Sequence, residues 1–205
     1  MTISEATRFL EKAFNIFNKK YFKNELPKVA ITIQHSPKAY GHFVTSEIWN
    51  IETSNYFEIN LGAETLNRPI AQTMGTLIHE MTHLYCHING IKDTSRRGQY
   101  HNKRFKQEAE KRGIEISFNK QIGWSVTTPT KELEQYCADK FGIDKIDVVR
   151  RDVFGDDGKE TKKTARYKYT CPCCELSFSL TKSVNLICGV CYQENGNIEM
   201  LQTAV

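Results

Sequence analysis

Residues 79–83 read His79-Glu80-Met81-Thr82-His83 and stand inside a stretch that predicts one long helix, from about Pro69 to His87. Pro69 suits the first turn of such a helix, and Asn89-Gly90 is a typical stop signal. Residues four positions apart lie one turn apart on the same face of a helix, so His79 and His83 can face one metal ion. Apolar residues flank the motif, as a buried helix requires: Met74, Leu77, Ile78 and Leu84.

The motif has the composition of a catalytic zinc site. Zinc binds histidine nitrogens at about 2.0–2.1 Å and keeps one position open for water when it is catalytic. Glu80 follows the first histidine, where it can reach that water without being a ligand and act as general base. The alternative is a core helix with two incidental histidines and a surface glutamate. The long helical context and the apolar flanks favour the metal site.

A catalytic zinc ion needs a third protein ligand, and the sequence offers several downstream. His87 continues the four-residue series, but it lies about 12 Å along the helix from His79, too far for one ion to bridge. Glu108 lies in a strongly charged helix, where a solvated position is the better interpretation. His101 follows an irregular, glycine-containing stretch, Gly98-Gln99-Tyr100, where the chain could fold back on the first helix. It is the strongest candidate.

The rest of the pattern before residue 114 predicts an α+β fold. Thr2 and Glu5 have the spacing of a capping box and open an amphipathic helix that ends near Asn24. Three strand-like stretches follow, Val29–Ile33, Gly41–Val44 and Phe57–Leu61. We expect the first helix and a small three-stranded sheet to pack against the helix that carries the motif. We expect Phe57–Leu61 to be the sheet edge that holds an extended substrate.

The sequence after Arg112 carries weaker signals. A helix should cover about His101 to Arg112, and Lys131–Phe141 could form another short one. The polar, glycine-punctuated stretch 155–163 is typical of a linker or an exposed hairpin. We therefore expect three parts: a zincin-like core over residues 1–114, a connecting segment over 115–164, and a small metal-binding module over 165–205.

Two Cys-x-x-Cys pairs near the end of the sequence predict that module. Each pair forms a turn that presents two thiolates, and two such turns make a closed, structural four-sulfur zinc site. The expected ligands are Cys171, Cys174, Cys188 and Cys191. Cys173 could replace a neighbour if the turn shifts, and a redox dithiol is the alternative use. Leu176, Phe178 and Leu180 alternate as in a strand, so the segment reads as a zinc ribbon that is too small to fold without metal.

Basic and aromatic residues precede the ribbon, as in platforms that bind single-stranded nucleic acid. The candidate nucleic-acid-binding residues are Lys162, Lys163, Arg166, Tyr167, Lys168 and Tyr169. A second basic set surrounds His101, namely Arg96, Arg97, Lys103, Arg104 and Lys106. The alternative is a solvated linker that leads into a strand whose tyrosines pack the ribbon.

The overall composition is that of an ordinary soluble protein. The hydrophobic fraction is 40%, the charged fraction 25% and the formal net charge +4. No apolar run approaches the ~20 residues of a membrane span. The segment Met1–Glu5 has neither the basic nor the apolar region of a secretory signal. We therefore expect a cytoplasmic protein without a membrane partner, and the odd total of seven cysteines argues against a disulfide framework.

Taken in order, these pieces resemble the SprT-like family, which includes the bacterial SprT proteins and the Spartan proteases of animals. The resemblance rests on Tyr40–Phe43, Glu58–Leu61, His79–His83, Gly98–Phe105 and the paired cysteines, and it is weakest over residues 115–165. It implies a zinc metalloprotease acting on protein or peptide substrates. His79, His83 and His101 would hold the catalytic zinc ion, with Glu80 as base, and a second, structural zinc ion would lie in the ribbon.

Spartan proteases cleave proteins crosslinked to DNA, so the resemblance extends to DNA as a partner, with single strands preferred if the tyrosines stack on bases. The alternative function is a nucleic acid-binding zinc-ribbon protein whose zincin domain is inactive or structural. An intact Glu80 favours the enzyme, because a degenerate site would be expected to lose its base before its ligands.

Overall fold

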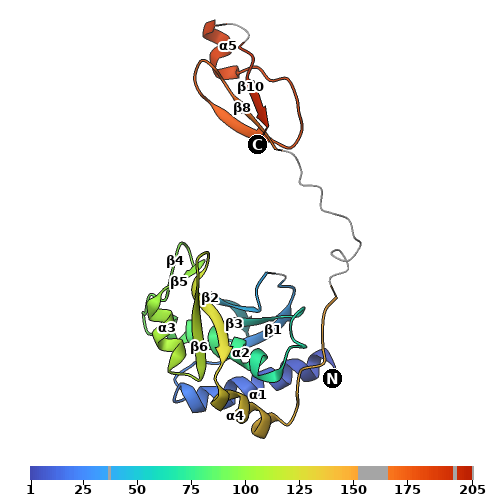
Figure 1. Ribbon diagram of the computed structural model, residues 1–205, viewed down its shortest axis with the longest axis vertical. Helices are drawn as coiled ribbons and strands as arrows, with labels where there is room; N and C mark the ends of the chain where they lie inside the picture. Colours follow the sequence, from blue (N-terminus) through green and yellow to red (C-terminus); the bar gives the residue numbers. More distant parts are fainter. Residues whose placement is uncertain (37, 152–165, 196–197, 205) are drawn as a thin grey trace. The chain divides into compact units, whose positions relative to one another are not determined.

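The computed structural model describes residues 1–36, 38–151, 166–195 and 198–204. The chain divides into two compact units, Met1–Asp152 and Val153–Val205 (Figure 1). The predicted linker with Lys159, Lys162 and Lys163 lies outside the described residues. Within the described ranges, the helices are all too short or too polar to cross a membrane.

The first unit opens with helix α1, Ile3–Tyr21, which begins as the sequence predicts. The Thr2 hydroxyl accepts from the Glu5 N–H at 3.2 Å, and the Glu5 carboxylate accepts from the Thr2 N–H at 2.7 Å, so the capping box is confirmed. The helix ends where the buried Asn18 amide bonds both backbone groups of Leu26. These bonds turn the chain back toward the first strand.

The first sheet contains β1 (Val29–Gln34), β2 (Gly41–Ile51) and β3 (Ser54–Gly62). Its order is β1-β3-β2, with β1 parallel and β2 antiparallel to β3. The predicted three-stranded sheet is confirmed, but the placing of Phe57–Leu61 at its edge is wrong, because these residues lie in the central strand. The alternation of apolar and polar residues predicts which face of the sheet each side chain takes. It does not predict which strands lie next to one another. Among the described strands of this sheet, β1 and β2 are the edges, and β2 is the edge strand that contacts the following helix, Ile70–Ile88.

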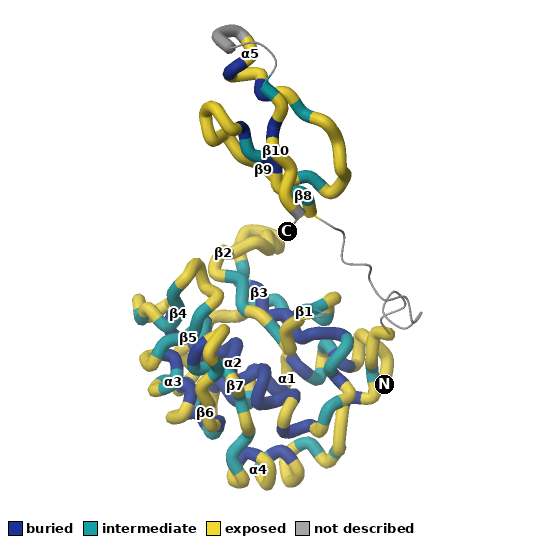
Figure 2. The backbone as a smooth tube through the Cα atoms, turned by 45° about the horizontal axis from the view of Figure 1, so that its top comes forward, coloured by how far each residue is buried: buried dark blue, intermediate teal, exposed yellow. Residues whose placement is uncertain are grey.

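Helix α2, Ile70–Ile88, is the predicted long helix and lies at the centre of the unit. Pro69 stands one position before it, and Asn89 ends it. Figure 2 shows α2 dark blue over most of its length, and its apolar side chains are fully buried: Met74, Leu77, Ile78, Met81 and Leu84. A helix buried on nearly all sides has little room to shift, so it holds its polar side chains in fixed positions.

A second, mixed sheet follows that the sequence did not predict. It contains β4 (Thr94–Ser95), β5 (Tyr100–His101), β7 (Gly123–Pro129) and β6 (Ile114–Asn119), in that spatial order. Helix α3, Lys103–Glu110, is shorter than expected, because Asn102 caps its first turn and leaves His101 on the preceding strand. Gly123 makes this strand pairing possible: it has a φ of +77°, and a β-carbon there would collide with the His101 carbonyl.

Residues 115–148 differ from the connecting segment that we expected. Helix α4 runs over Lys131–Phe141 with the predicted bounds, and it lies beside α1, where the Phe9 and Phe141 rings meet edge to face at 5.2 Å (Figure 1). Side chains of this region are buried in the common core, namely Ile116, Leu133, Cys137 and Ile146. The first unit therefore extends well past residue 114.

The second unit is a small antiparallel sheet with one short helix. The strands β8 (Tyr167–Thr170), β9 (Ser177–Leu180) and β10 (Leu201–Ala204) take the order β10-β8-β9, and α5 covers Gly189–Asn195. Its buried cluster consists of Tyr169, Cys171, Cys188, Cys191 and Met200. Three cysteines in so small a core are consistent with a unit that a metal ion stabilises through sulfur ligands.

Candidate metal centres and active-site cleft

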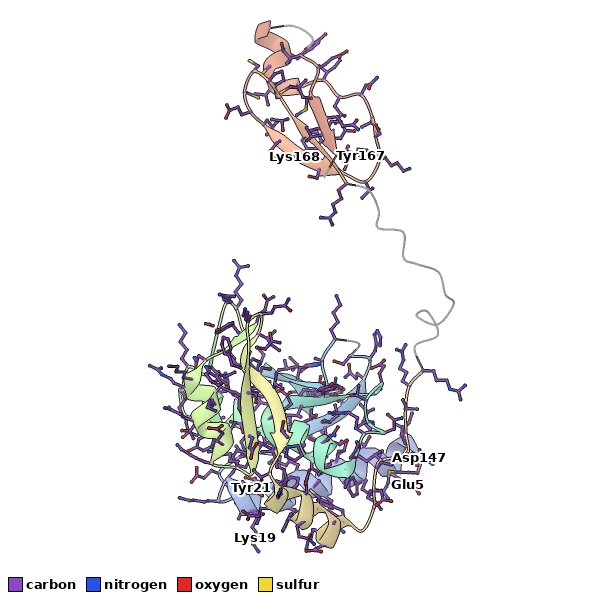
Figure 3. The ribbon with its side chains drawn as sticks, viewed as in Figure 1. Glu5, Lys19, Tyr21, Asp147, Tyr167 and Lys168 are labelled. Carbon is purple, nitrogen blue, oxygen red and sulfur yellow. The ribbon has the colours of Figure 1, made fainter. Side chains whose placement is uncertain are left out.

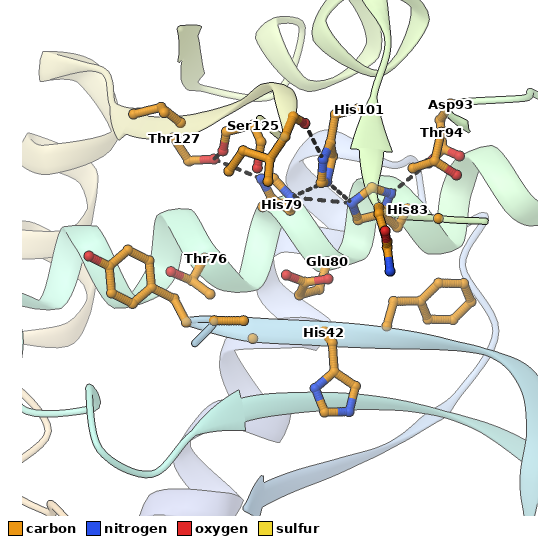
Figure 4. A pocket seen from close by; sticks show the side chains of 18 of the residues that line it. His42, Thr76, His79, Glu80, His83, Asp93, Thr94, His101, Ser125 and Thr127 are labelled. Carbon is orange, nitrogen blue, oxygen red and sulfur yellow. Dashed lines mark hydrogen bonds and ion pairs between the residues drawn. The ribbon is translucent and has the colours of Figure 1, made fainter. Parts of the chain in front are cut away.

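Three histidines from two elements converge on one point. His79 and His83 lie one turn apart on α2, and His101 reaches them from β5 (Figure 4). The Nε2 atoms are 3.2 Å apart for His79 and His83, 3.3 Å for His79 and His101, and 3.0 Å for His83 and His101. Nitrogens bound tetrahedrally to one zinc ion at 2.0–2.1 Å would lie roughly 3.3 Å apart. The three imidazoles therefore fit a single ion.

The protonation of these rings also suits a metal site. Burial lowers the pKa of His79 well below its usual range, and it lowers the pKa of His101 to about 4. Both rings are therefore neutral at physiological pH, and each keeps one nitrogen lone pair for a ligand bond. Two positively charged rings at this distance would repel each other, whereas a shared cation explains why the three nitrogens face one another.

A hydrogen bond at Nδ1 holds each ring with its Nε2 atom toward the centre. The acceptors are the Thr127 hydroxyl for His79 at 2.7 Å, the Asp93 carboxylate for His83 at 2.6 Å, and the Ile122 carbonyl for His101 at 3.3 Å. Such partners fix the tautomer and the orientation of a ligating histidine. All three acceptor residues lie ten or more positions after His83, so the spacing within the motif could not predict them.

Phe105 forms the wall behind the cluster. Its side chain is fully buried, and its ring centroid lies 4.5 Å from that of His79, 4.4 Å from that of His83 and 4.9 Å from that of His101. The hydrogen bonds from Asn102 fix the first turn of α3, on which Phe105 lies. The ring keeps water away from that side and limits the rotation of all three imidazoles.

Glu80 lies beside the cluster and is not part of it. Figure 4 shows its carboxylate near the histidines, above the strand that carries His42. Burial raises the pKa of Glu80 to about 7, which the nearby His83 ring and the Phe43 backbone N–H only partly offset. A carboxylate with a pKa near neutrality can take up and release a proton during a reaction.

The three histidines line one cleft with a volume of about 1380 Å³, together with Glu80, Asp93 and Thr127. Its walls come from the start of β2, from α2, from the segment Ile91–Thr94 and from β7. Gly41 lets β2 approach both β3 and α2, because a β-carbon there would lie 2.8 Å from the Asn60 carbonyl oxygen on β3 and 3.3 Å from Glu80 Cγ on α2. The cleft therefore has room for an extended polypeptide beside the histidine cluster.

The model of the SprT-like family matches residues 10–122, which is more than half of the chain. The chain belongs to the SprT-like family. The match includes α2 and the three histidines, so the resemblance that we read from the motifs is confirmed. No curated protein sequence and no solved structure showed a significant match.

The other candidate ligands in the SprT-like domain lie apart from the histidine cluster. His87 is exposed and contacts the rings of Phe43 and Phe57 edge to face. Glu108 pairs with Lys111 at 2.6 Å and with Arg112 at 3.0 Å. The structure thus brings together His79, His83 and His101, the set that the resemblance implied.

The second candidate metal centre lies outside the SprT-like domain, in the C-terminal unit. The sulfur atoms of Cys171, Cys174, Cys188 and Cys191 lie within 4.8 Å of one another. The distance is 3.8 Å between Cys171 and Cys191 and 3.6 Å between Cys174 and Cys188, and zinc–sulfur bonds of 2.3 Å imply roughly 3.8 Å. Cys173 is not in this group, and its backbone N–H points to the Cys171 sulfur at 3.4 Å. The arrangement is consistent with a zinc ribbon.

The candidate nucleic-acid-binding residues of this unit fall into three groups. Arg166 and Lys168 are exposed and Tyr167 is half-buried; Figure 3 labels Tyr167 and Lys168 on β8. Tyr169 is only 1% exposed, and its hydroxyl donates to Gln202 at 2.9 Å and accepts from the Val184 N–H at 2.9 Å. Its assignment as a base-stacking residue is therefore wrong, because the ring is buried in the ribbon core. Lys162 and Lys163 lie outside the described residues.

Proposed function

We propose that this SprT-like protein is a zinc-dependent metallopeptidase that hydrolyses peptide bonds in protein substrates. The observation that carries the proposal is the group of three Nε2 atoms, 3.0–3.3 Å apart, beside a buried glutamate that is not part of the group. A site with three histidines leaves a position open, which is typical of catalytic zinc, whereas the closed four-sulfur set is typical of structural zinc.

The residues of the cleft have separate roles in the proposed reaction. Zinc held by the three histidines would polarise the substrate carbonyl and make water more acidic. The Glu80 carboxylate takes the proton from the attacking water and returns it to the nitrogen that leaves when the C–N bond breaks. Thr127, Asp93 and Phe105 keep the imidazoles oriented, so no side chain has to be reordered during the reaction.

The edge of β2 is the surface on which an extended substrate would lie. Residues Tyr40–Phe43 line the cleft next to Glu80, and β3 pairs with only one side of β2. A peptide that adds to an exposed edge gains main-chain hydrogen bonds that do not depend on its side chains. The proposed substrates are therefore unfolded or locally extended segments of proteins.

Incubation with an unfolded protein tests the proposed activity. We expect fragments to appear, to disappear after chelation of the metal, and to return when zinc is added back. Chelation also removes metal from the ribbon, so the Cys188→Ser variant is the control that loses the ribbon site alone. Absence of proteolysis across varied free and DNA-bound substrates would contradict the proposal and favour a binding protein.

We also propose that the substrates include proteins held on DNA. A depression of about 450 Å³ near His101 combines basic and aromatic side chains, with Tyr100, Asn102, Lys103, Phe118 and Trp124 as its lining. The Lys106 ammonium lies 4.7 Å from the Trp124 ring centroid, and the Arg96 guanidinium lies 4.7 Å from that of Tyr100. Rings for bases and charges for phosphates are what single-stranded DNA requires.

A titration with labelled single-stranded and duplex DNA at two salt concentrations tests this second proposal. Each neutralised phosphate should add roughly −0.9 to the log–log salt slope on duplex DNA and about −0.7 on single strands. Tyr167→Ala should cost about 1–3 kcal/mol of single-strand binding if this ring stacks on a base. Binding that is undetectable at low salt would contradict a DNA role. Binding that is unchanged when Lys162, Lys163 and Arg166 are replaced together would exclude the residues before the ribbon from that role.

A further inference from the structure

Arg68 is a fixed, half-buried cation on the wall of the cleft. It lies between β3 and α2, and its Nε atom donates to the Thr65 carbonyl at 2.9 Å. One terminal nitrogen donates to the Thr76 hydroxyl at 2.9 Å. The Tyr40 ring centroid lies 3.9 Å from the guanidinium carbon, so one flat face of the cation is covered. These contacts leave the guanidinium little freedom to turn.

The described residues provide this cation with no anion. No carboxylate of residues 1–36 or 38–151 forms an ion pair with Arg68, although other arginines of the unit, Arg112 and Arg150, have glutamate partners. Burial lowers the pKa of the Arg68 guanidinium, and the nearby Tyr40 phenol only partly offsets this effect. Two of its five N–H donors are used in the bonds to Thr65 and Thr76. A partly desolvated cation with spare donors is suited to a carboxylate from a ligand.

Arg68 contacts helix α2 one turn before Glu80. Thr76, which it contacts, lies one helical turn before Glu80 on the same face of α2 (Figure 4). Four residues of helix correspond to about 6 Å, and an extended chain advances about 3.3 Å per residue. A carboxylate on the guanidinium would therefore belong to a substrate residue about two or three positions from the bond that is cut.

The direction of β2 indicates on which side of that bond the residue lies. Gly41 is next to Thr76 and Glu80, and Phe43 is next to His87, so β2 runs in the same direction as α2. A substrate that adds antiparallel to β2 would run the opposite way, with its C-terminal part toward Tyr40 and Arg68. Both a C-terminal carboxylate and an acidic side chain can then reach the guanidinium.

We propose that Arg68 recognises a carboxylate of the substrate, two or three residues to the C-terminal side of the cleaved bond, and thereby sets a preference for acidic sequences or nearby chain ends. The assignment rests on the proposed peptidase function. Replacing a purely structural arginine at this place would change the binding and cleavage of all substrates alike. Replacing a recognition residue would change the ratio of affinities, or of kcat/KM values, between acidic and neutral substrates. That ratio is the quantity to measure.

The test begins with binding, which does not depend on turnover. Fluorescent decapeptides carry one glutamate at successive positions, or glutamine in its place, and each is made as C-terminal acid and as C-terminal amide. Their affinities are measured with the zinc-loaded Glu80→Gln variant, and kcat/KM is then measured with the wild type. At one position we expect the glutamate peptide to bind about 10- to 100-fold more tightly than the glutamine peptide, or the C-terminal acid to bind more tightly than the amide by the same factor. This is the range of a charge-assisted hydrogen-bonded pair.

Variants then assign the preference to a residue. Arg68→Gln, added to Glu80→Gln for binding and made alone for kcat/KM, should abolish the preference. Arg68→Lys, made in the same way, should reduce the preference, because lysine keeps the charge without the planar fork. This variant also replaces Arg68→Gln if the latter folds poorly. The matched control is Lys92→Gln, which removes an exposed charge from the same cleft. It should keep the preference.

The outcomes separate this assignment from the proposed function. Equal binding of glutamate and glutamine peptides, or a preference that survives Arg68→Gln or is lost in Lys92→Gln, overturns the role of Arg68. Hydrolysis without any preference overturns it too, while it supports the peptidase. A binding preference that depends on Arg68 in a protein that cleaves nothing supports the carboxylate site and refutes the peptidase.

Discussion

At the scale of single residues, the histidine cluster depends on partners that contribute no metal-binding atom. His83 is oriented by Asp93, whose carboxylate lies 2.6 Å from Nδ1, and His79 by the Thr127 hydroxyl at 2.7 Å. A ligand with such a partner keeps one tautomer, so zinc binding does not have to select it from several. The affinity of the site should therefore depend on these partners as well as on the ligands.

We predict that Asp93→Ala weakens zinc binding at the histidine site about 10- to 100-fold, because the His83 ring loses its fixed tautomer. Competition with a graded series of chelators measures the change, and the ribbon site should keep its affinity. Asp147→Ala is the matched control, since that carboxylate is 80% exposed and pairs with Lys145 at 3.6 Å. Equal zinc retention in the two variants would remove Asp93 from the site.

At the scale of elements, local sequence predicted the helices better than the sheets. The capping box of α1, the long course of α2 and both ends of α4 follow from side chains within a few residues of each other. The second sheet was missed, because β5 has two residues and pairs with β7, more than twenty positions away. The second sheet depends on the close approach of Gly123 to His101, which the periodicity of the sequence does not predict.

The inclusion of residues 115–148 in the core leads to a prediction about α4. Leu133 is fully buried there, so Leu133→Ala should lower the free energy of unfolding by about 2–5 kcal/mol through lost burial and the cavity left behind. Chemical denaturation of the full chain measures this change. Glu134→Ala, an exposed substitution on the same helix, should have almost no effect. Similar small effects of both substitutions would mean that α4 is only a connecting segment.

At the scale of the whole molecule, two units carry two independent ligand sets, one of three histidines and one of four cysteines. The sequence was sufficient for the four cysteines, through two Cys-x-x-Cys turns, and for His79 and His83, through helical spacing. It also made His101 the strongest candidate for the third ligand, and the family resemblance supported that choice, but the strand that carries His101 was not predicted. The placing of Thr127 and Asp93 was not predictable, because it depends on how the second sheet covers α2.

Independence of the two sets predicts the metal content of variants. The wild type should bind about two zinc ions per chain. His101→Ala should keep the ribbon ion and lose the other, and Cys188→Ser should do the reverse while its C-terminal unit becomes sensitive to proteolysis. Elemental analysis of the purified proteins gives the counts. Full zinc content in His101→Ala, together with a loss in Glu108→Ala, would show that the third ligand has been misassigned.

We propose that Glu80 serves as the base of a zinc peptidase without being a ligand, and Glu80→Gln tests this role most directly. The substitution keeps the shape of the side chain and removes its basicity. Zinc content and hydrolysis of an unfolded protein are measured on the same preparation. We predict wild-type zinc content with hydrolysis reduced about 10²- to 10⁴-fold. Undiminished hydrolysis, or loss of zinc from the histidine site, would contradict this role of Glu80.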